Sequence, residues 1–261
     1  MSVHPLSPAA GTSRTARLGG AWLRSITVVP VETGWQARTA PDEETLLVVL
    51  SGTFDLFAGG SSWLQRGLRA TPFAGRPCGL YLPPGVEVRV AGQGEVLLVA
   101  ALRPKDEEKQ PDPASMPLLP LAGSGKAFDS RTGTWQLLER FPSAPEAVLP
   151  RAIERTAVEG VAVERVFPYA FKAQALCLDE AVVAPGQSVV LPRPHTPPGT
   201  SFGDELAVFV RAEQACTVGD GERHRVTGEA VVTLDAARPP RIDPSGGRAY
   251  VVAVWAGRKP T

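Results

Sequence analysis

The sequence predicts an all-β protein made of two small β-barrels or jelly rolls in tandem. Glycine and proline each occur 26 times among the 261 residues, so about one residue in five interrupts a helix, where average usage gives roughly one in eight. Short apolar or alternating runs recur between Gly- and Pro-rich turns, which is typical of many short strands. Few stretches are long enough for a helical bundle or for the crossover helices of a doubly wound sheet.

The first half of the chain contains the clearest strand patterns. A β-branched apolar run leads through a Ser-Gly turn into an alternating strand, and two further turns lie at Pro83 to Gly85 and at Gly92 to Gly94. Residues 21–103 are therefore predicted to form the N-terminal barrel, after a flexible polar arm at residues 1–20. The predicted strands are Ser25 to Val31, Glu44 to Leu56, Leu80 to Leu82, Val86 to Val90 and Val96 to Leu102.

The second half repeats this pattern after a break. Residues 104–127 are rich in proline and charge, which predicts a linker that buries too little apolar surface to fold. The segment Asp204 to Val218 is similar to Glu43 to Phe57, and Glu229 to Trp255 is similar to Cys78 to Ala101. Two copies of one small barrel would explain the repetition, so residues 128–261 are predicted to form the C-terminal barrel.

Composition narrows the possible partners. Basic and acidic residues number 27 each, for a formal net charge of zero, which removes the main attraction to nucleic acid. No apolar run approaches the ~20 residues of a membrane span, and the N-terminus lacks the apolar region of a signal peptide. Three cysteines without a CxxC spacing do not fit a secreted disulfide framework, so we expect a cytoplasmic protein. Exposed barrel edges predict a homodimer.

The strongest chemical signal surrounds one of only three histidines. His195 follows a Pro-Arg-Pro segment, and Asp204 and Glu205 open a predicted strand. A histidine and a carboxylate on adjacent strands can both point into a barrel mouth and bind a divalent metal, which would polarise a carbonyl or enediolate oxygen. In the alternative interpretation, His195 caps a turn and Glu205 faces solvent. The residues alone support both equally.

Several motifs together resemble one known family. In the first half they are LLVVLSGTFDL (residues 46–56), Trp63 with Gly67-x-Arg69, Phe73-x-Gly75 and GLYLPPG (residues 79–85). In the second half they are APGQSVVLPRPH (184–195), DELAVFVR (204–211) and GGRAYVVAVWAG (246–257). In this order they are similar to the 5-deoxy-glucuronate isomerase family of myo-inositol catabolism, over about two thirds of the chain.

The resemblance implies a bicupin, which is a tandem of two cupin barrels, and the isomerisation of a deoxy sugar acid from aldose to ketose by an intramolecular oxidoreductase. It also implies one divalent metal in the C-terminal barrel, held by a His-x-His pair, a Glu and a later His. His195 matches the first histidine and Glu205 the carboxylate, but Pro197 and Pro239 stand where the other two histidines belong. Val88 replaces the usual cupin histidine of the first half. The metal site is therefore expected to be degenerate.

Two functions remain open at this point. An isomerase needs a base that moves a proton between adjacent carbons and a group that stabilises the oxyanion; Glu205 and His195 are the candidate catalytic residues and metal ligands. Arg193, Asp204 and Arg241 are the candidate substrate-binding residues. The alternative is a non-catalytic bicupin that binds a sugar acid or another small anion, or that serves as a scaffold.

Overall fold

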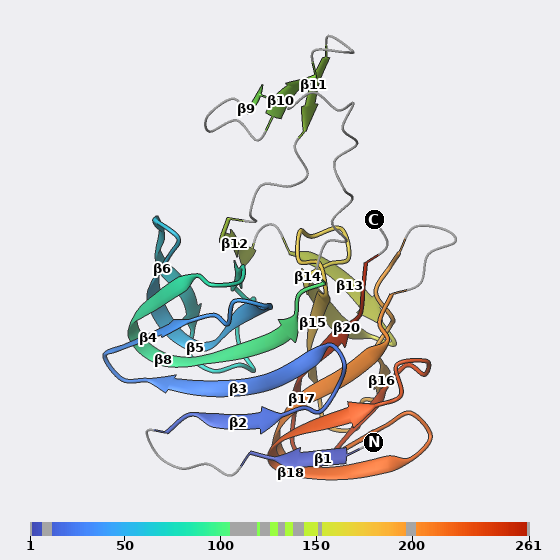
Figure 1. Ribbon diagram of the computed structural model, residues 1–261. Coiled ribbons are helices and arrows are strands. Elements are labelled where there is room, and N and C mark those ends of the chain that lie inside the picture. Colours follow the sequence, from blue (N-terminus) through green and yellow to red (C-terminus); the bar gives the residue numbers. More distant parts are fainter. Residues whose placement is uncertain are drawn as a thin grey trace. The chain divides into compact units, whose positions relative to one another are not determined.

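The two halves of the chain form two β-sheets that each wrap into a barrel (Figure 1). In the computed structural model, the described residues are 2–6, 12–104, 144–150, 153–196 and 202–259, together with the backbone of three short strands at 119–120, 126–129 and 134–137. Within these ranges there is no α-helix, and hence no helix that could cross a membrane. The predicted all-β tandem-barrel fold is confirmed.

The N-terminal sheet has eight strands in the order β12-β7-β5-β8-β3-β2, with β6 on β5 and β4 on β8. Two long strands, β5 and β8, pair along their whole length and belong to both layers of the barrel. The strands are β2 (Arg14–Arg17), β3 (Leu23–Val31), β4 (Gly34–Arg38), β5 (Glu43–Ala58), β6 (Ser61–Arg69), β7 (Gly79–Leu82), β8 (Glu87–Leu102) and β12 (Glu146–Val148).

Glycines let β5 and β8 bend from one layer into the other. Gly52 and Gly94 face each other across the two strands, and both have a positive φ. A Cβ on Gly52 would lie 2.8 Å from the Cα of Gly94, so only glycine allows this approach. The predicted turns at these positions are therefore bends inside continuous strands, because paired glycines can bend a ladder without ending it.

The C-terminal sheet has nine strands in the order β1-β18-β17-β20-β15-β14-β13, with β19 joining β16 to β17. The strands are β1 (Ser2–Pro5), β13 (Glu154–Val158), β14 (Val161–Phe167), β15 (Leu176–Val183), β16 (Val189–Val190), β17 (Glu205–Gly219), β18 (Arg223–Leu234), β19 (Arg241–Ser245) and β20 (Ala249–Ala256).

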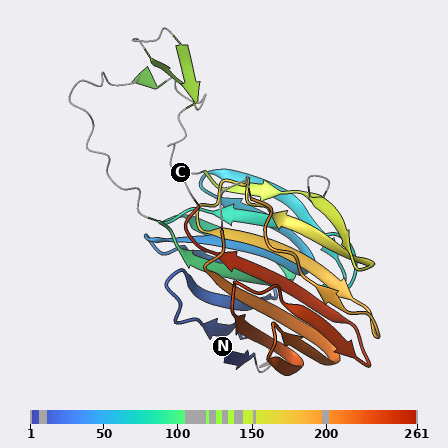
Figure 2. The same cartoon turned by 90° about the vertical axis from the view of Figure 1, so that its right-hand side faces the viewer.

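Each barrel includes a strand from the other half of the sequence. The N-terminal strand β1 pairs with β18, with His4 opposite Val231, and Figure 2 shows the blue N-terminal strand beside the orange β18. Conversely, β12 pairs with β7, with Ala147 opposite Leu80. The prediction of a flexible arm at residues 1–20 was therefore wrong for β1 and β2, because their backbones complete sheet edges. The boundary at residue 128 likewise assigned β12 to the wrong barrel.

Residues 104–144 form a separate unit. It contains β9 (Leu119–Pro120), β10 (Lys126–Asp129) and β11 (Thr134–Leu137), which form a three-stranded antiparallel sheet with Lys126 opposite Leu137. The predicted linker at residues 104–127 thus includes β9 and the start of β10.

The alternation of side chains along each strand builds three apolar layers. On β17, Leu206 and Val208 point into the C-terminal barrel, whereas Ala207 and Phe209 point into a layer between the two barrels. Residues of β3 and β5 enter that same layer from the N-terminal barrel. Strands buried on both faces read as continuous apolar runs, which explains sequences such as TLLVVL in β5.

Two charged clusters lie between the barrels. Arg69 donates two hydrogen bonds to Glu180, of 2.8 and 3.2 Å, and the hydroxyl of Tyr250 donates a third at 2.8 Å. Both members of this ion pair are buried. Nearer the surface, Arg14 and Arg211 each contact the same two carboxylates, Glu95 and Glu229. These contacts fix the two barrels against each other.

Candidate functional site

Glu205, the predicted metal ligand, is held by the other barrel. It opens β17 on the same face as Ala207 and Phe209, so its carboxylate points into the layer between the barrels. It accepts hydrogen bonds from the backbone N–H groups of Trp22 at 3.1 Å and Leu23 at 2.8 Å, and a further one from Ala21. A Cβ on Gly20 would collide with this carboxylate. Glu205 therefore links the start of β17 to the backbone of the N-terminal barrel.

A cavity of about 330 Å³ lies beside this contact. Asp204 and Glu205 both line it, together with His4, whose Nε2 is 2.7 Å from the Oγ of Ser2. The structure thus brings two of the predicted site residues together, although the histidine beside them comes from the N-terminal strand and is not His195.

The other predicted residues lie elsewhere. His195 is exposed on the segment after β16. Arg193 donates hydrogen bonds of 3.3 Å to the carbonyls of Phe202 and Gly203. Its guanidinium carbon lies 5.8 Å from the ring centre of Trp255. Pro197 lies outside the described residues.

Arg241 is far from Glu205, because it pairs with Gly219 at the opposite end of β17. There it lines a second cavity of about 290 Å³ with Pro239 and Asp243. Its Nε is 3.3 Å from an oxygen of Asp243. Arg241 and Glu205 therefore do not share a site.

Polar groups that the sequence did not single out lie inside the C-terminal barrel. Asp179 on β15 shares a face with Cys177 and Ala181, which belong to the apolar interior. Arg165 on β14 lies directly opposite Asp179. Trp255 on β20 lies opposite Cys177 and is fully buried. This group of Arg165, Asp179 and Trp255 is called the barrel triad below.

Each member of the barrel triad has a buried polar atom without a hydrogen-bond partner among the described residues. The atoms are Nε of Arg165, Oδ2 of Asp179 and Nε1 of Trp255. Burial raises the pKa of Asp179 to about 7, against the opposing charge of Arg165 and with a smaller contribution from Glu154. Buried polar atoms normally have hydrogen-bond partners. Unpaired atoms such as these are typical of sites where a bound water or ligand supplies the missing hydrogen bonds.

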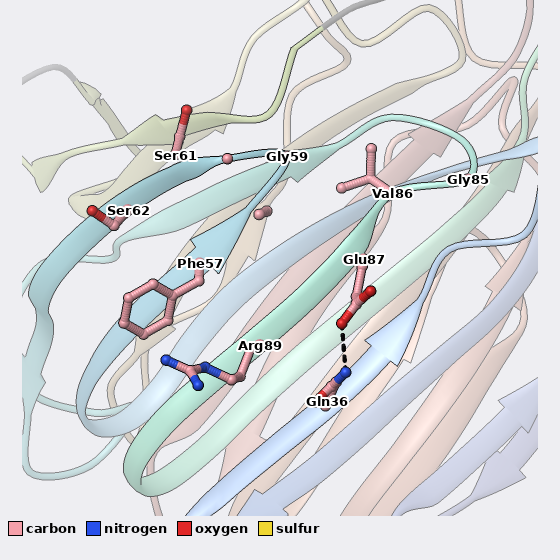
Figure 3. Close-up of a pocket in the computed structure, with 11 residues that line it drawn as sticks. Gln36, Phe57, Gly59, Ser61, Ser62, Gly85, Val86, Glu87 and Arg89 are labelled. Atoms are coloured by element: carbon pink, nitrogen blue, oxygen red, sulfur yellow. Dashed lines mark hydrogen bonds between the residues drawn. The ribbon is translucent and has the colours of Figure 1, made fainter.

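The N-terminal barrel has a shallower groove of about 820 Å³ on its outer surface. Figure 3 shows the ring of Phe57 beside the guanidinium of Arg89, at 4.4 Å from the ring centre. It also shows Gln36 donating a 2.5 Å hydrogen bond to Glu87. Glu87 and Arg89 are both exposed, and each already has a side-chain partner, Gln36 and Phe57. This groove is therefore a weaker candidate than the barrel triad.

Comparison with known proteins finds one family similarity. Residues 14–132 match the model of the KduI/IolB family. The N-terminal half of the chain is similar to this family. The match covers the N-terminal barrel, and the structural comparisons extend the likeness of fold across the C-terminal one. No curated protein sequence matches the chain.

The fold of the chain is that of bicupins. An IolB-like protein from Salmonella typhimurium LT2 superposes with a TM-score of 0.66 and 17% identity, over 91% of this chain and 85% of that one. A glyoxylate-induced protein from Pseudomonas aeruginosa gives 0.56 and 12%, over 95% and 82%. An oxalate decarboxylase variant from Bacillus subtilis gives 0.55 and 11%, over 95% and 74%.

Among the described residues, Glu205 does not fit the metal site that the family resemblance implies, because its carboxylate points into the layer between the barrels. There its oxygens accept three backbone N–H hydrogen bonds. Within the described ranges, no three His, Cys, Asp or Glu side chains are grouped so that they could hold an ion. In the N-terminal barrel, Val88 is buried among apolar side chains.

One sequence feature could have revealed the barrel triad. The run LCLDEAVV places Asp179 and Glu180 within an otherwise apolar strand. In a strand buried on both faces, adjacent carboxylates must point to opposite sides, so each needs its own partner. Glu180 forms an ion pair with Arg69 between the barrels, whereas Asp179 faces the interior of the C-terminal barrel.

Proposed function

We propose that this protein is a 5-deoxy-glucuronate isomerase-like bicupin that binds a sugar acid in its C-terminal barrel and has lost the family's metal-dependent reaction. The similarity of residues 14–132 to the KduI/IolB family supports a sugar isomerase-like cupin. The substrate, the loss of the metal site and a place in inositol catabolism are the parts that we propose. A cytoplasmic location is part of the same proposal, and the three cysteines are free and buried.

The hydrogen bonds to Glu205 are the observation that carries the proposal. In an aldose–ketose isomerisation, a metal would stabilise the negative oxygen that forms at the carbonyl. A carboxylate that points between the barrels and accepts three backbone N–H hydrogen bonds there is poorly placed to hold that metal. Pro239 can neither ligate a metal nor transfer a proton. Glu205 and Pro239 are therefore the two positions that support the proposed loss of the metal site.

A sugar acid nevertheless matches the groups that remain. Arg193 lies over the ring of Trp255 near the end of the C-terminal barrel where β15 begins and β20 ends. Guanidinium groups recognise carboxylates, and Arg193 is exposed. We therefore expect Arg193 to bind the acid group of the sugar without a metal.

A second candidate is isomerisation without a metal, and Asp179 favours it. A base works best when its pKa is close to the ambient pH, and burial brings the pKa of Asp179 to about 7. Such a base would take the proton from C2 of the aldose and return it to C1, while the hydroxyl proton at C2 moves to the carbonyl oxygen.

The test measures binding and turnover on the same preparation. Isothermal titration with D-glucuronate is expected to show binding, and incubation with 5-deoxy-glucuronate is expected to show no ketose, with or without added Mn²⁺, Zn²⁺ or Fe²⁺. Arg89→Met in the outer groove is the matched control and should leave binding unchanged. Metal-dependent turnover would overturn the proposed loss of activity, metal-free turnover would establish the second candidate, and absence of binding would overturn the proposal.

A further inference from the structure

We propose that four arginines at one end of the C-terminal barrel form a binding site for the phosphate group of a small phosphate monoester. The four, called the arginine patch below, are Arg223, Arg225, Arg238 and Arg241. The inference goes beyond the proposed function and does not rest on it, because the patch lies at the end of β17 opposite to Glu205. Arg193 lies over Trp255, which is opposite Leu206 near the start of β17.

The strand register brings two arginines to the same glycine. Gly219, the last residue of β17, is opposite Arg223 on β18 and opposite Arg241 on β19. Residues directly opposite each other in a sheet share a face, and Arg225, two residues along β18, shares it as well. A Cβ at Gly219 would collide with the carbonyl oxygen of Glu222, so only glycine lets the turn after β17 bend over this position.

A cavity of about 290 Å³ lies where these elements meet, and a loop brings a third guanidinium to it. An Nη atom of Arg238 lies 3.1 Å from where a Cβ on Gly221 would be, and Gly221 lines the cavity. Asp220 accepts a 2.9 Å hydrogen bond from the backbone N–H of Asp235, whose carbonyl accepts one of 3.1 Å from the backbone N–H of Arg238. These bonds hold the loop in place before a ligand arrives, which lowers the entropy cost of binding.

The guanidinium groups of the arginine patch are available to a ligand. All four arginines are exposed, and apart from Arg241 they form no side-chain hydrogen bond or ion pair with any residue that the structure describes. Arg241 donates one hydrogen bond of 3.3 Å, from its Nε to Asp243, which leaves its Nη groups. The four positive charges outnumber the two carboxylates that line the cavity, those of Asp220 and Asp243. The surroundings of the cavity are therefore positive and attract an anion.

The number of guanidinium groups favours a phosphate over a carboxylate. One guanidinium satisfies a carboxylate with two parallel hydrogen bonds. A phosphate monoester has a charge of about −1.5 to −2 at pH 7 and three acceptor oxygens, so several arginines can bind it at once. Because one water molecule occupies roughly 30 Å³, the cavity of about 290 Å³ also has room for the small organic group that carries the phosphate.

D-Glucose 6-phosphate and D-glucose are the probes, because they differ only by the phosphate group. Isothermal titration of the full-length protein should give a dissociation constant for the phosphate ester at least about tenfold below that for D-glucose. Arg223→Gln and Arg241→Gln should each raise the dissociation constant of the ester about tenfold or more, as the loss of a hydrogen bond to a charged group predicts. Arg89→Gln is the matched control, because it removes an exposed arginine from the N-terminal barrel, and it should leave this constant unchanged.

A second measurement does not depend on any variant. In wild-type protein, the ¹⁵N–¹H resonances of the Arg223 and Arg241 guanidinium groups should shift on addition of D-glucose 6-phosphate and remain in place on addition of D-glucose. Equal affinities for the two probes, an equal effect of Arg241→Gln and Arg89→Gln, or unmoved guanidinium resonances would overturn the assignment.

Titration with D-glucuronate separates this inference from the proposed function. Wild-type protein saturated with D-glucose 6-phosphate should bind D-glucuronate as tightly as free protein does, and so should Arg241→Gln. If the phosphate ester binds as expected and D-glucuronate does not bind, the proposed function fails and the inference stands. If D-glucuronate binds and the ester does not, the inference fails and the proposed function stands. Competition of the two compounds for one site would overturn the assignment of a separate phosphate site.

Discussion

Glu205 accepts a 2.8 Å hydrogen bond from the backbone N–H of Leu23, a residue of the other barrel. The contact explains why a carboxylate at the start of β17 need not be catalytic. Glu205 shares its strand face with residues of the layer between barrels, so its hydrogen-bond donors are backbone amides of the other barrel. In this protein, the position that resembles a metal ligand stabilises the tandem arrangement.

Replacing Glu205 with alanine should therefore destabilise the protein. The change leaves the backbone N–H groups of Trp22 and Leu23 without their acceptor, at a cost of roughly 2–4 kcal/mol in the free energy of unfolding. Urea denaturation followed by circular dichroism measures this difference. Asp204→Asn is the control, since Asp204 is exposed and its substitution should change stability by less than about 0.5 kcal/mol. Equal stability of the two variants would show that the Glu205 contact contributes little.

The buried pair of Arg69 and Glu180 gives a second prediction. Arg69→Met leaves the Glu180 carboxylate charged and buried, and should cost about 3–5 kcal/mol. The double variant Arg69→Met with Glu180→Leu should recover most of that loss, because it removes both charges. Arg248→Met, which breaks the exposed pair with Glu213, should cost far less stability than Arg69→Met, because exposed ion pairs contribute little. A double variant as unstable as the single one would contradict this account.

Asp179 predicts a specific dependence of stability on pH. Its pKa is about 7 in the folded protein, against an ordinary value of 3.8, so the folded state binds the proton more tightly than the unfolded state. The resulting stabilisation is fully present below pH 3.8 and is lost as the pH rises through about 7. Over this range it changes the free energy of unfolding by at most about 4 kcal/mol. The groups that face Asp179 are Arg165, Glu154 and Cys177.

The comparison with Asp179→Asn isolates this contribution. Thermal melts of both proteins from pH 4 to pH 8 should show wild type losing stability relative to the variant as the pH rises. Parallel curves across this interval would mean that Asp179 has an ordinary pKa.

The expected homodimer gives a prediction for strand β6. Among the described strands, β6 pairs with β5 alone, and its Leu64 and Leu68 are 56% and 77% exposed. Exposed edge strands with apolar side chains promote association. Light scattering should give twice the chain mass of 27.6 kDa, and the double variant Leu64→Ser with Leu68→Ser should be monomeric. A wild-type monomer would exclude the dimer, and a dimeric double variant would exclude this edge.

The sequence allowed the fold to be predicted further than the site. Alternating and β-branched runs identified β3, β5, β7, β8 and β17, because the period of a strand is set by local geometry, but strands such as β4, β6 and β13 were not predicted. The pairing of β1 with β18 and of β12 with β7 joins residues far apart in the chain. A local sequence pattern does not predict that the two barrels exchange strands in this way. Likewise, the partners of Glu205 and the inward direction of Asp179 follow from register, which the sequence alone does not determine.

The most direct test of the central claim is the effect of metal removal on sugar-acid binding. Protein from cells grown with added Mn²⁺, Zn²⁺ and Fe²⁺ is analysed for metal and titrated with D-glucuronate before and after dialysis against EDTA. We predict metal well below one ion per chain and the same dissociation constant in both titrations. One bound ion per chain that is lost in His195→Ala, with binding abolished by EDTA, would contradict the account.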